Sequence, residues 1–269
     1  MLKSFKKYLN ETLVGEKPIT SMESYLKGMS KGLTDKLFFL DKIDFDCLVD
    51  FGSADGYILS EIRKIKPDVK LIGYDIDENM IEISKNKFKD IDFTDNWNEI
   101  NYKIKEYKKP AVFLSSVIHE VYSYSSGKDI KNFWNNIFNS GFEYIAIRDM
   151  MPSIDYEYMN NKDIQKVREM SDEKYLTDFE KEWGQLELNF RNLLHWFLKY
   201  SYTDNWDREL KENYVPITIE TLKKKIPSGY RIAYENHYVY DFLKSKIKKD
   251  FDITLNEPTH LKMIIKKNS

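Results

Sequence analysis

The stretch from Cys47 to Asp75 limits the fold of this chain more than any other part of it. It consists of an apolar run, a glycine turn, an amphipathic run and a second apolar run that ends in an acid. The first run, Cys47–Phe51, is almost entirely apolar and predicts a buried strand. Tyr57–Lys66 has apolar residues at helical spacing and is followed by Pro67, so we expect a helix there. Strand, helix and strand in this order predict a βαβ unit of a parallel sheet.

The turn and the final acid of this unit suit a nucleoside. Gly52–Gly56 has no large side chain, so its backbone can approach a ligand closely. The helix that follows directs its free N–H groups and the positive end of its dipole into the same space. Asp75 can accept hydrogen bonds from two ribose hydroxyls. This is the arrangement of a nucleoside-cofactor site in an open parallel sheet, and a βαβ turn without a ligand is the alternative.

The glycine pattern distinguishes between nucleoside cofactors. Ala54 and Tyr57 stand where the dinucleotide fingerprint G-x-G-x-x-G has its second and third glycines. The pattern D-x-G-x-A-x-G, from Asp50 to Gly56, instead resembles motif I of the class I S-adenosylmethionine-dependent methyltransferases, an acid followed by G-x-G-x-G. This chain departs from the motif at Ala54. The resemblance implies that S-adenosyl-L-methionine is the cofactor.

The resemblance also implies roles for individual residues. The turn is expected to hold the methionine end of the cofactor, and Ile76 to pack on adenine. Asp95 and Asn96, after a short strand, match the position that meets the adenine amino group, although such residues are also ordinary turn formers. The residues implied to bind the cofactor are Asp50, Gly52, Ser53, Ala54, Gly56, Asp75, Ile76, Asp95, Asn96, Ser116 and Val117.

A second motif indicates where methyl transfer would take place. The string S-S-V-I-H-E-V at the end of the predicted strand 111–117 resembles motif IV of small-molecule methyltransferases. His119 is therefore a candidate general base or orienting donor, with Glu120 as its orienting partner; a histidine satisfied within a loop is the alternative. Asp149, at the end of the predicted strand 144–150, is a further catalytic candidate. The candidate substrate contacts are Tyr25, Tyr122, His195, His237 and Tyr238.

The remaining patterns predict three regions. Residues 1–46 predict an N-terminal helical lid, whose Tyr25, Lys31 and Lys36 are candidates to face the site; the alternative is that they are solvated or packing residues. Residues 47–152 and 217–269 predict a Rossmann-like methyltransferase domain. Its fold class is α/β, a three-layer sheet of parallel strands with one antiparallel C-terminal strand. Residues 153–216 predict a helical insertion over the active site, in which apolar residues from Phe179 to Phe197 recur every three or four positions and predict one long helix.

Composition and residue spacing argue against several other classes of protein. The formal net charge is −2, from 42 basic and 44 acidic residues, which gives no global attraction to nucleic acid or to a membrane surface. The lysine runs 223–225 and 244–249 are solvated faces or, alternatively, a nucleic-acid footprint. The single cysteine and four scattered histidines give no metal-site spacing. With no apolar signal segment and no run long enough to span a bilayer, we expect a cytoplasmic protein without a membrane partner.

Together these patterns predict a methyltransferase that transfers a methyl group in line from S-adenosyl-L-methionine. We favour a small-molecule acceptor. A nucleic-acid methyltransferase is the first alternative, supported by the lysine runs and by aromatic residues that could stack on bases. A non-catalytic cofactor-binding module is the second. A nicotinamide oxidoreductase is disfavoured by Ala54 and Tyr57.

Overall fold

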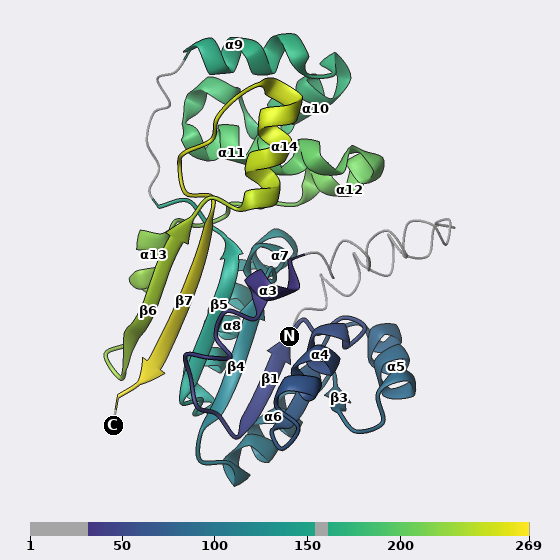
Figure 1. The fold of residues 1–269 in the computed structure, drawn as a ribbon, viewed down its shortest axis with the longest axis vertical. Helices are drawn as coiled ribbons and strands as arrows, with labels where there is room; N and C mark the ends of the chain where they lie inside the picture. Colours follow the sequence, from purple (N-terminus) through teal and green to yellow (C-terminus); the bar gives the residue numbers. More distant parts are fainter. Residues whose placement is uncertain (1–31, 154–160, 269) are drawn as a thin grey trace. The chain divides into compact units, whose positions relative to one another are not determined.

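A seven-stranded sheet organises the structure, a computed structural model that describes residues 32–153 and 161–268. The strand order is β3-β2-β1-β4-β5-β7-β6 (Figure 1). The strands are β1 (Cys47–Phe51), β2 (Lys70–Tyr74), β3 (Asp92–Thr94), β4 (Pro110–Ser115), β5 (Tyr144–Met150), β6 (Tyr230–Tyr238) and β7 (His260–Lys267).

Strand directions bring the candidate site together. β1 pairs in parallel with β2 and β4, and the parallel pairing continues to β3 and β5. β7 is antiparallel to both of its neighbours, because its beginning is bonded to their ends: the N–H of Thr259 donates to Tyr238 at the end of β6, and Met151, just after β5, donates to Thr259. The carboxyl ends of β1, β2, β4 and β5 therefore meet at one edge of the sheet. The predicted α/β fold class, with one antiparallel C-terminal strand, is confirmed.

Helices cover both faces of the sheet, as Figure 1 shows. Alternate residues of a strand point to opposite faces. Leu48 of β1 belongs to an apolar cluster with Ile62, whereas Phe51 contacts the rings of Trp97 and Phe133. The helices on this part of the chain are α3 (Leu33–Lys36), α4 (Tyr57–Ile65), α5 (Glu78–Lys87), α6 (Trp97–Lys103), α7 (Ile118–Tyr124) and α8 (Gly127–Asn139).

The chain forms two compact units. The sheet unit comprises the described residues up to Arg148 together with Ile226–Glu235 and the residues from Lys262. The helical unit comprises Asp149–Lys225 and Asn236–Leu261. The predicted boundaries of the insertion, and its place over the active site, stay predictions. Of the predicted N-terminal lid, the first 31 residues lie outside the described part of the chain.

The helical unit has its own apolar core. Its helices are α9 (Asn161–Met170), α10 (Glu173–Trp183), α11 (Phe190–Lys199), α12 (Trp206–Lys211), α13 (Ile219–Lys223) and α14 (Asp241–Phe251). The prediction of one long helix from Phe179 to Phe197 is wrong. Gly184, at φ 88° and ψ 174°, ends α10, and the Asn189 side chain caps α11 by accepting from the N–H of Asn192. The apolar spacing continues across the break because both helices pack into the same core.

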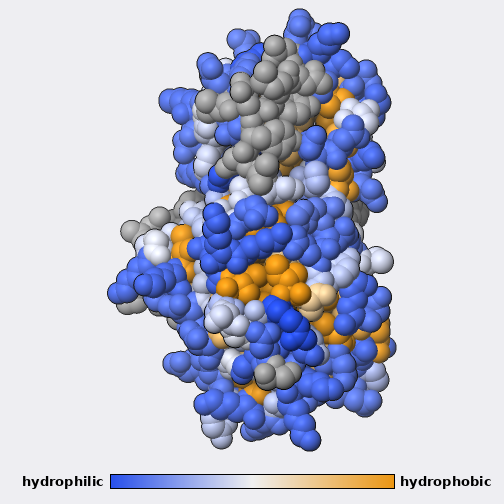
Figure 2. Space-filling model, turned by 90° about the vertical axis from the view of Figure 1, so that its left-hand side faces the viewer, coloured by the Kyte–Doolittle hydropathy of each residue, from blue (hydrophilic) through white to orange (hydrophobic). Residues whose placement is uncertain are grey.

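The visible surface is mostly polar. Figure 2 shows one face covered largely by hydrophilic residues around a limited apolar area. The large apolar side chains most exposed to solvent lie on separate elements, among them Ile65 of α4, Ile83 of α5 and Tyr102 of α6. Scattered apolar residues of this kind are normal on a protein surface. No helix within the described ranges has both the length and the hydropathy needed to cross a bilayer.

Gly56, which begins α4, meets two constraints at once. Its φ of 76° is in the left-handed region that favours glycine. A Cβ atom there would lie 2.6 Å from Cζ of Phe93 and 3.1 Å from Cδ2 of Phe88. Gly141 also has a positive φ, of 95°, but a Cβ atom there would meet nothing within 4 Å. Comparing substitutions at the two glycines therefore separates the cost of backbone strain from the cost of steric overlap.

We expect Gly56→Ala to destabilise the protein more than Gly141→Ala. Strain of a non-glycine residue at positive φ should cost about 1–2 kcal/mol at both positions, and overpacking against Phe93 should cost about 1–3 kcal/mol more at Gly56 alone. Denaturant unfolding of both variants measures the difference. Equal losses would show that the Phe93 ring moves aside without cost.

Candidate cofactor site

The turn between β1 and α4 is bonded to the end of β2. The N–H groups of Gly52 and Ser53 both donate to the carbonyl oxygen of Tyr74, at 2.8 and 3.0 Å. The N–H of Ala54 donates to Oδ2 of Asp75 at 2.8 Å, and the N–H of Asp77 donates to Oδ1 of Asp75 at 3.0 Å. The Asp75 carboxylate therefore joins the turn after β1 to the turn after β2.

Asp75 keeps some capacity to bind a ligand. A carboxylate offers about four acceptor positions, and these two hydrogen bonds leave room for a ribose hydroxyl. Burial raises the pKa of Asp75 above its ordinary value, although the backbone N–H groups of Asp77 and Ala54 act in the opposite direction. The predicted ribose-binding acid is thus also part of the framework of the turn.

The turn itself is shaped for close approach. Gly52 has a φ of 80° and Ala54 a φ of 44°, so the chain passes through the left-handed region at both positions. A Cβ atom on Gly52 would lie 2.9 Å from Cγ2 of Val117. The backbone of the turn therefore lies close to the residue that follows β4. That Gly52 and Val117 both bind the cofactor stays a prediction.

Buried polar atoms at this edge have no hydrogen-bond partner within the described residues. They are Oδ2 of Asp50, Oγ of Ser53 and Oγ of Ser115. Asp50 is 2% exposed and Ser53 is 3% exposed. Native proteins pair the great majority of such atoms. Three of them at or next to the ends of β1 and β4 fit a site that a polar ligand completes.

A cluster of charged residues lies at the same edge and was not predicted. Arg148 of β5 is 5% exposed; its Nε and Nη2 bond Oδ2 of Asp35 at 2.9 and 2.8 Å. Nζ of Lys262 lies 2.5 Å from Oδ1 of Asp35. Nη1 of Arg148 donates to Oγ of Ser116 at 3.0 Å, and the N–H of Ser116, at φ 53°, donates to the carbonyl oxygen of Arg148. These bonds attach α3 to β5 and β7.

Two further members of the cluster have strongly perturbed pKa values. Burial raises the pKa of Asp50 to about 7, while the nearby Lys36 acts to lower it. Burial and the charge of Arg148 lower the pKa of Lys36 to about 8, while Asp50 and Asp35 act to raise it. We call Asp35, Lys36, Asp50, Arg148 and Lys262 the edge cluster.

The predicted motif IV residues begin a helix rather than a loop. β4 ends at Ser115, and α7 starts at Ile118, so that His119 and Glu120 occupy its first turn. His119 is buried and Glu120 is half-buried. The hydroxyl of Tyr122, predicted to contact substrate, accepts a hydrogen bond from Nε1 of Trp134 in α8 at 3.1 Å. The roles of these three residues stay predictions.

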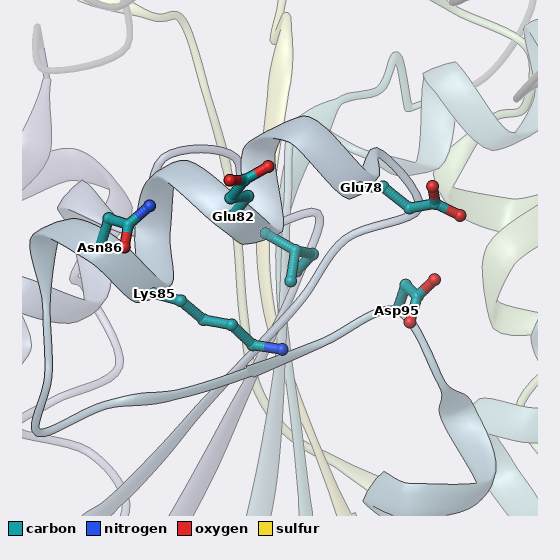
Figure 3. A pocket seen from close by; sticks show the side chains of 6 residues that line it. Glu78, Glu82, Lys85, Asn86 and Asp95 are labelled. Atoms are coloured by element: carbon teal, nitrogen blue, oxygen red, sulfur yellow. The ribbon is translucent and has the colours of Figure 1, made fainter.

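Asp95 and Asn96 have different surroundings. The Asn96 side chain accepts the N–H of Asn98 at 3.0 Å and so caps α6, which is the turn-forming role left open above. Asp95 is exposed and lines a pocket of about 440 Å³ on α5. Figure 3 shows the carboxylates of Asp95 and Glu78 close together at one end of this pocket. Ile76, between Asp75 and the cap of α5, is half-buried.

Four other predicted residues belong to the helical unit, and Tyr25 lies outside the described residues, as does Lys31. Asp149 is fully buried, and its Oδ1 accepts the N–H of Met150 at 2.8 Å. His195 is 2% exposed, and its Nε2 accepts the N–H of Tyr214 at 3.2 Å. His237 and Tyr238 are half-buried at the end of β6.

Sequence reasoning missed three of the charged residues that shape this edge. Asp35, Arg148 and Lys262 all belong to the edge cluster, and Lys36 was noted only as a lid residue. A signal was present, because Arg148 interrupts the apolar run Y-I-A-I-R-D-M of β5. A charge inside a buried strand requires a partner. The identity of the partner could not be read from the sequence.

Comparisons with known proteins bear on the fold. No family model matches this chain, and no curated protein matches it. A solved structure of the plantazolicin methyltransferase BpumL in complex with SAH matches with a TM-score of 0.55 and 12% identity, over 99% of this chain and 96% of that chain. A second, of BpumL with a triazolic desmethylPZN analog and SAH, matches with a TM-score of 0.53 and 12% identity, over 93% and 91%. The chain therefore has the class I methyltransferase fold that its motifs predict.

We expect the stability of the protein to depend on the charge of Asp50. Because the pKa of Asp50 rises from 3.8 to about 7 on folding, the folded state binds a proton that the unfolded chain releases between these values. The free energy of unfolding should therefore fall as the pH rises through this range. Asp50→Asn removes this contribution. The free energy of unfolding of the variant, minus that of the natural protein, should therefore rise by at least about 1 kcal/mol between about pH 5 and about pH 7.

Denaturant unfolding at the two pH values measures the change, and Asp68→Asn, at an exposed position, is the control. If the difference in unfolding free energy between Asp50→Asn and the natural protein changes with pH no more than that of the control, Asp50 is not a buried acid with a raised pKa.

Proposed function

We propose that this protein is an S-adenosyl-L-methionine-dependent methyltransferase that acts on a small-molecule acceptor. The observation that supports this most strongly is the turn Gly52–Gly56, held by Asp75 at the end of β2. The class I methyltransferase fold adds support, and the similar BpumL structures are complexes with SAH, the demethylated form of this cofactor. The unpartnered oxygen of Asp50 is a third line of support.

Methyl transfer requires the protein to bind and position the reacting groups rather than to supply a reactive side chain. The bound cofactor supplies a methyl group on a sulfonium, which a nucleophile attacks directly. Holding the reacting groups in line can contribute about 7–11 kcal/mol. In the proposal, the backbone from Gly52 to Gly56 lies against the methionine end, and Asp75 binds the ribose. Val117, packed near Gly52, lines the same space.

His119 is the proposed proton acceptor. It lies in the first turn of α7, two residues after Val117. An acceptor that carries a proton must lose it before or during methyl transfer, and a histidine has a pKa suited to this near neutral pH. Glu120 follows it directly and is proposed to orient the ring. Asp149 completes the proposed catalytic residues.

The lysine runs favour a small molecule over a nucleic acid. In α14, Nζ of Lys246 lies 2.6 Å from the carboxylate of Asp250, and Lys248 is bonded to Asp252. In α13, Nζ of Lys223 lies 3.4 Å from the carboxylate of Glu220. Acids one helical turn away therefore offset part of the positive charge. Phosphate binding depends on uncompensated positive charge.

We expect Asp75→Ala to weaken S-adenosyl-L-methionine binding at least about tenfold, or about 1.4 kcal/mol. The variant loses both the proposed ribose contact and the hydrogen bonds that hold the turn. Isothermal titration calorimetry measures the affinity. Asp92→Ala is a matched control, since Asp92 starts β3 and pairs with Lys70 and Lys103. An intact protein that fails to bind the cofactor would remove the basis of the proposal.

We expect no steeply salt-dependent binding to single-stranded RNA or DNA. A protein that neutralises several phosphates loses on the order of 10³-fold or more in affinity as salt rises from about 50 to about 200 mM. Fluorescence anisotropy with labelled oligonucleotides at both salt concentrations tests this. A steep dependence would favour the nucleic-acid alternative, and tight cofactor binding without turnover on any acceptor would favour a binding module.

A further inference from the structure

The backbone of Ser116 is strained where β4 leads into α7. β4 ends at Ser115 and α7 begins at Ile118. Ser116, between them, has a φ of 53°, in the left-handed region, which is unfavourable for a residue with a side chain. Backbone of this kind persists only where its surroundings hold it. Neighbouring groups must therefore supply the bonds that hold Ser116.

Arg148 of β5 bonds Ser116 twice. The N–H of Ser116 donates to the carbonyl oxygen of Arg148 at 2.8 Å, and the backbone of any residue at this position could accept that bond. Nη1 of Arg148 donates to Oγ of Ser116 at 3.0 Å. This second bond requires the arginine side chain. The identity of residue 148 therefore affects how firmly Ser116 is held.

The direction of Nη1 is itself fixed. Nε and Nη2 of Arg148 both bond Oδ2 of Asp35, at 2.9 and 2.8 Å. A guanidinium is planar and rigid, so these two bonds set the position of its third nitrogen. The side chain of Arg148 is 6% exposed, and Nζ of Lys262 lies 2.5 Å from the other oxygen of Asp35. The nitrogen that bonds Ser116 therefore has little freedom to move.

Ser116 is followed directly by residues proposed to face the reaction. Val117 comes next, and a Cβ atom on Gly52 would lie 2.9 Å from Cγ2 of Val117. Because so little space separates Gly52 from Val117, a changed backbone at Ser116 would alter the surroundings of the turn Gly52–Gly56. His119, the proposed proton acceptor, lies in the first turn of α7. The conformation of Ser116 thus affects both the cofactor side and the acceptor side of the proposed site.

We propose that Arg148 is a positioning residue of the methyltransferase. Its side chain holds Ser116 in the left-handed conformation, and this places Val117 and His119 beside the cofactor turn. The inference rests on the proposed function and adds to it a residue that acts through Ser116. It also explains why a charge interrupts the apolar run of β5, since only a side chain there bonds both α3 and the turn after β4.

Two substitutions at Ser116 test the proposal, with S-adenosylhomocysteine as the ligand and calorimetry as the measurement. Arg148→Met removes the bond to the hydroxyl but leaves Asp35 paired with Lys262. It should weaken binding about tenfold, because unsupported strain at such a position shifts an equilibrium by about this factor. Adding Ser116→Gly should recover at least about threefold of the loss, because glycine adopts this conformation without support. Adding Ser116→Ala should recover none, because alanine keeps the strain.

The comparison separates positioning from a general structural role. If Arg148 served only to attach α3 to the sheet, glycine and alanine at position 116 would behave alike, because both lack the hydroxyl. Arg168→Met is the control: Arg168 also bonds two carboxylates, of Glu180 and Glu187, but lies in the helical unit. Its affinity for the ligand should equal that of the natural protein. Thermal unfolding shows whether each variant is folded.

Equal affinities of the two double variants would overturn the inference, as would an Arg148→Met protein that binds as tightly as the natural one. If Arg148→Met does not fold, the single variants Ser116→Ala and Ser116→Gly provide the test. The alanine variant should then bind at least about threefold more weakly than the glycine variant, and equal binding would again overturn the inference. A natural protein that does not bind S-adenosylhomocysteine would instead overturn the proposed function.

Discussion

The hydrogen bonds of the Asp75 carboxylate are the interaction on which the candidate site depends. They fix the turn after β1 and the turn after β2 relative to each other, through the N–H groups of Ala54 and Asp77. The bond to Ala54 also holds a non-glycine residue at a φ of 44°, which is unfavourable by about 1–2 kcal/mol without such support. The residue proposed to bind the ribose is thus the one that shapes the turn. In the proposed function, the geometry of the turn and the binding of the ribose therefore depend on the same side chain.

Long-range charge pairing extends the site beyond the βαβ unit. An isolated helix of four residues is not stable in water, because forming its first turn is unfavourable. α3 is held at the carboxyl edge by the bonds of Asp35 to Arg148 and Lys262, whose side chains are 6% and 15% exposed, and by the packing of Leu33 and Leu37 against the apolar core. Breaking a largely buried pair by removing one partner is strongly unfavourable. The edge cluster therefore both helps to position α3 and contributes to the charge of the space next to Asp50.

Local patterns predicted what depends on local sequence. β1 and β5 begin and end at the predicted residues, because predominantly apolar runs predict buried strands. The helix predicted across Gly184 was wrong because the apolar period continued while the backbone broke. The bond between Asp35 and Arg148 joins residues 113 positions apart, and no periodicity reports such a pair. The motifs thus predicted the turn and its acid, whereas the edge cluster, which depends on tertiary structure, was found only in the structure.

The two acids at this edge have different surroundings, and this separates their functions. Burial raises the pKa of both Asp50 and Asp75. Backbone N–H groups bond both oxygens of Asp75, so part of its desolvation is compensated within the protein. Asp50 has the charge of Lys36 nearby but an oxygen without a hydrogen bond among the described residues. A ligand that donates a hydrogen bond gains more at an acid whose own partners are incomplete. Asp75 is therefore the acid whose hydrogen bonds shape the turn, whereas Asp50 is the acid that a hydrogen-bond donor on the proposed ligand would complete.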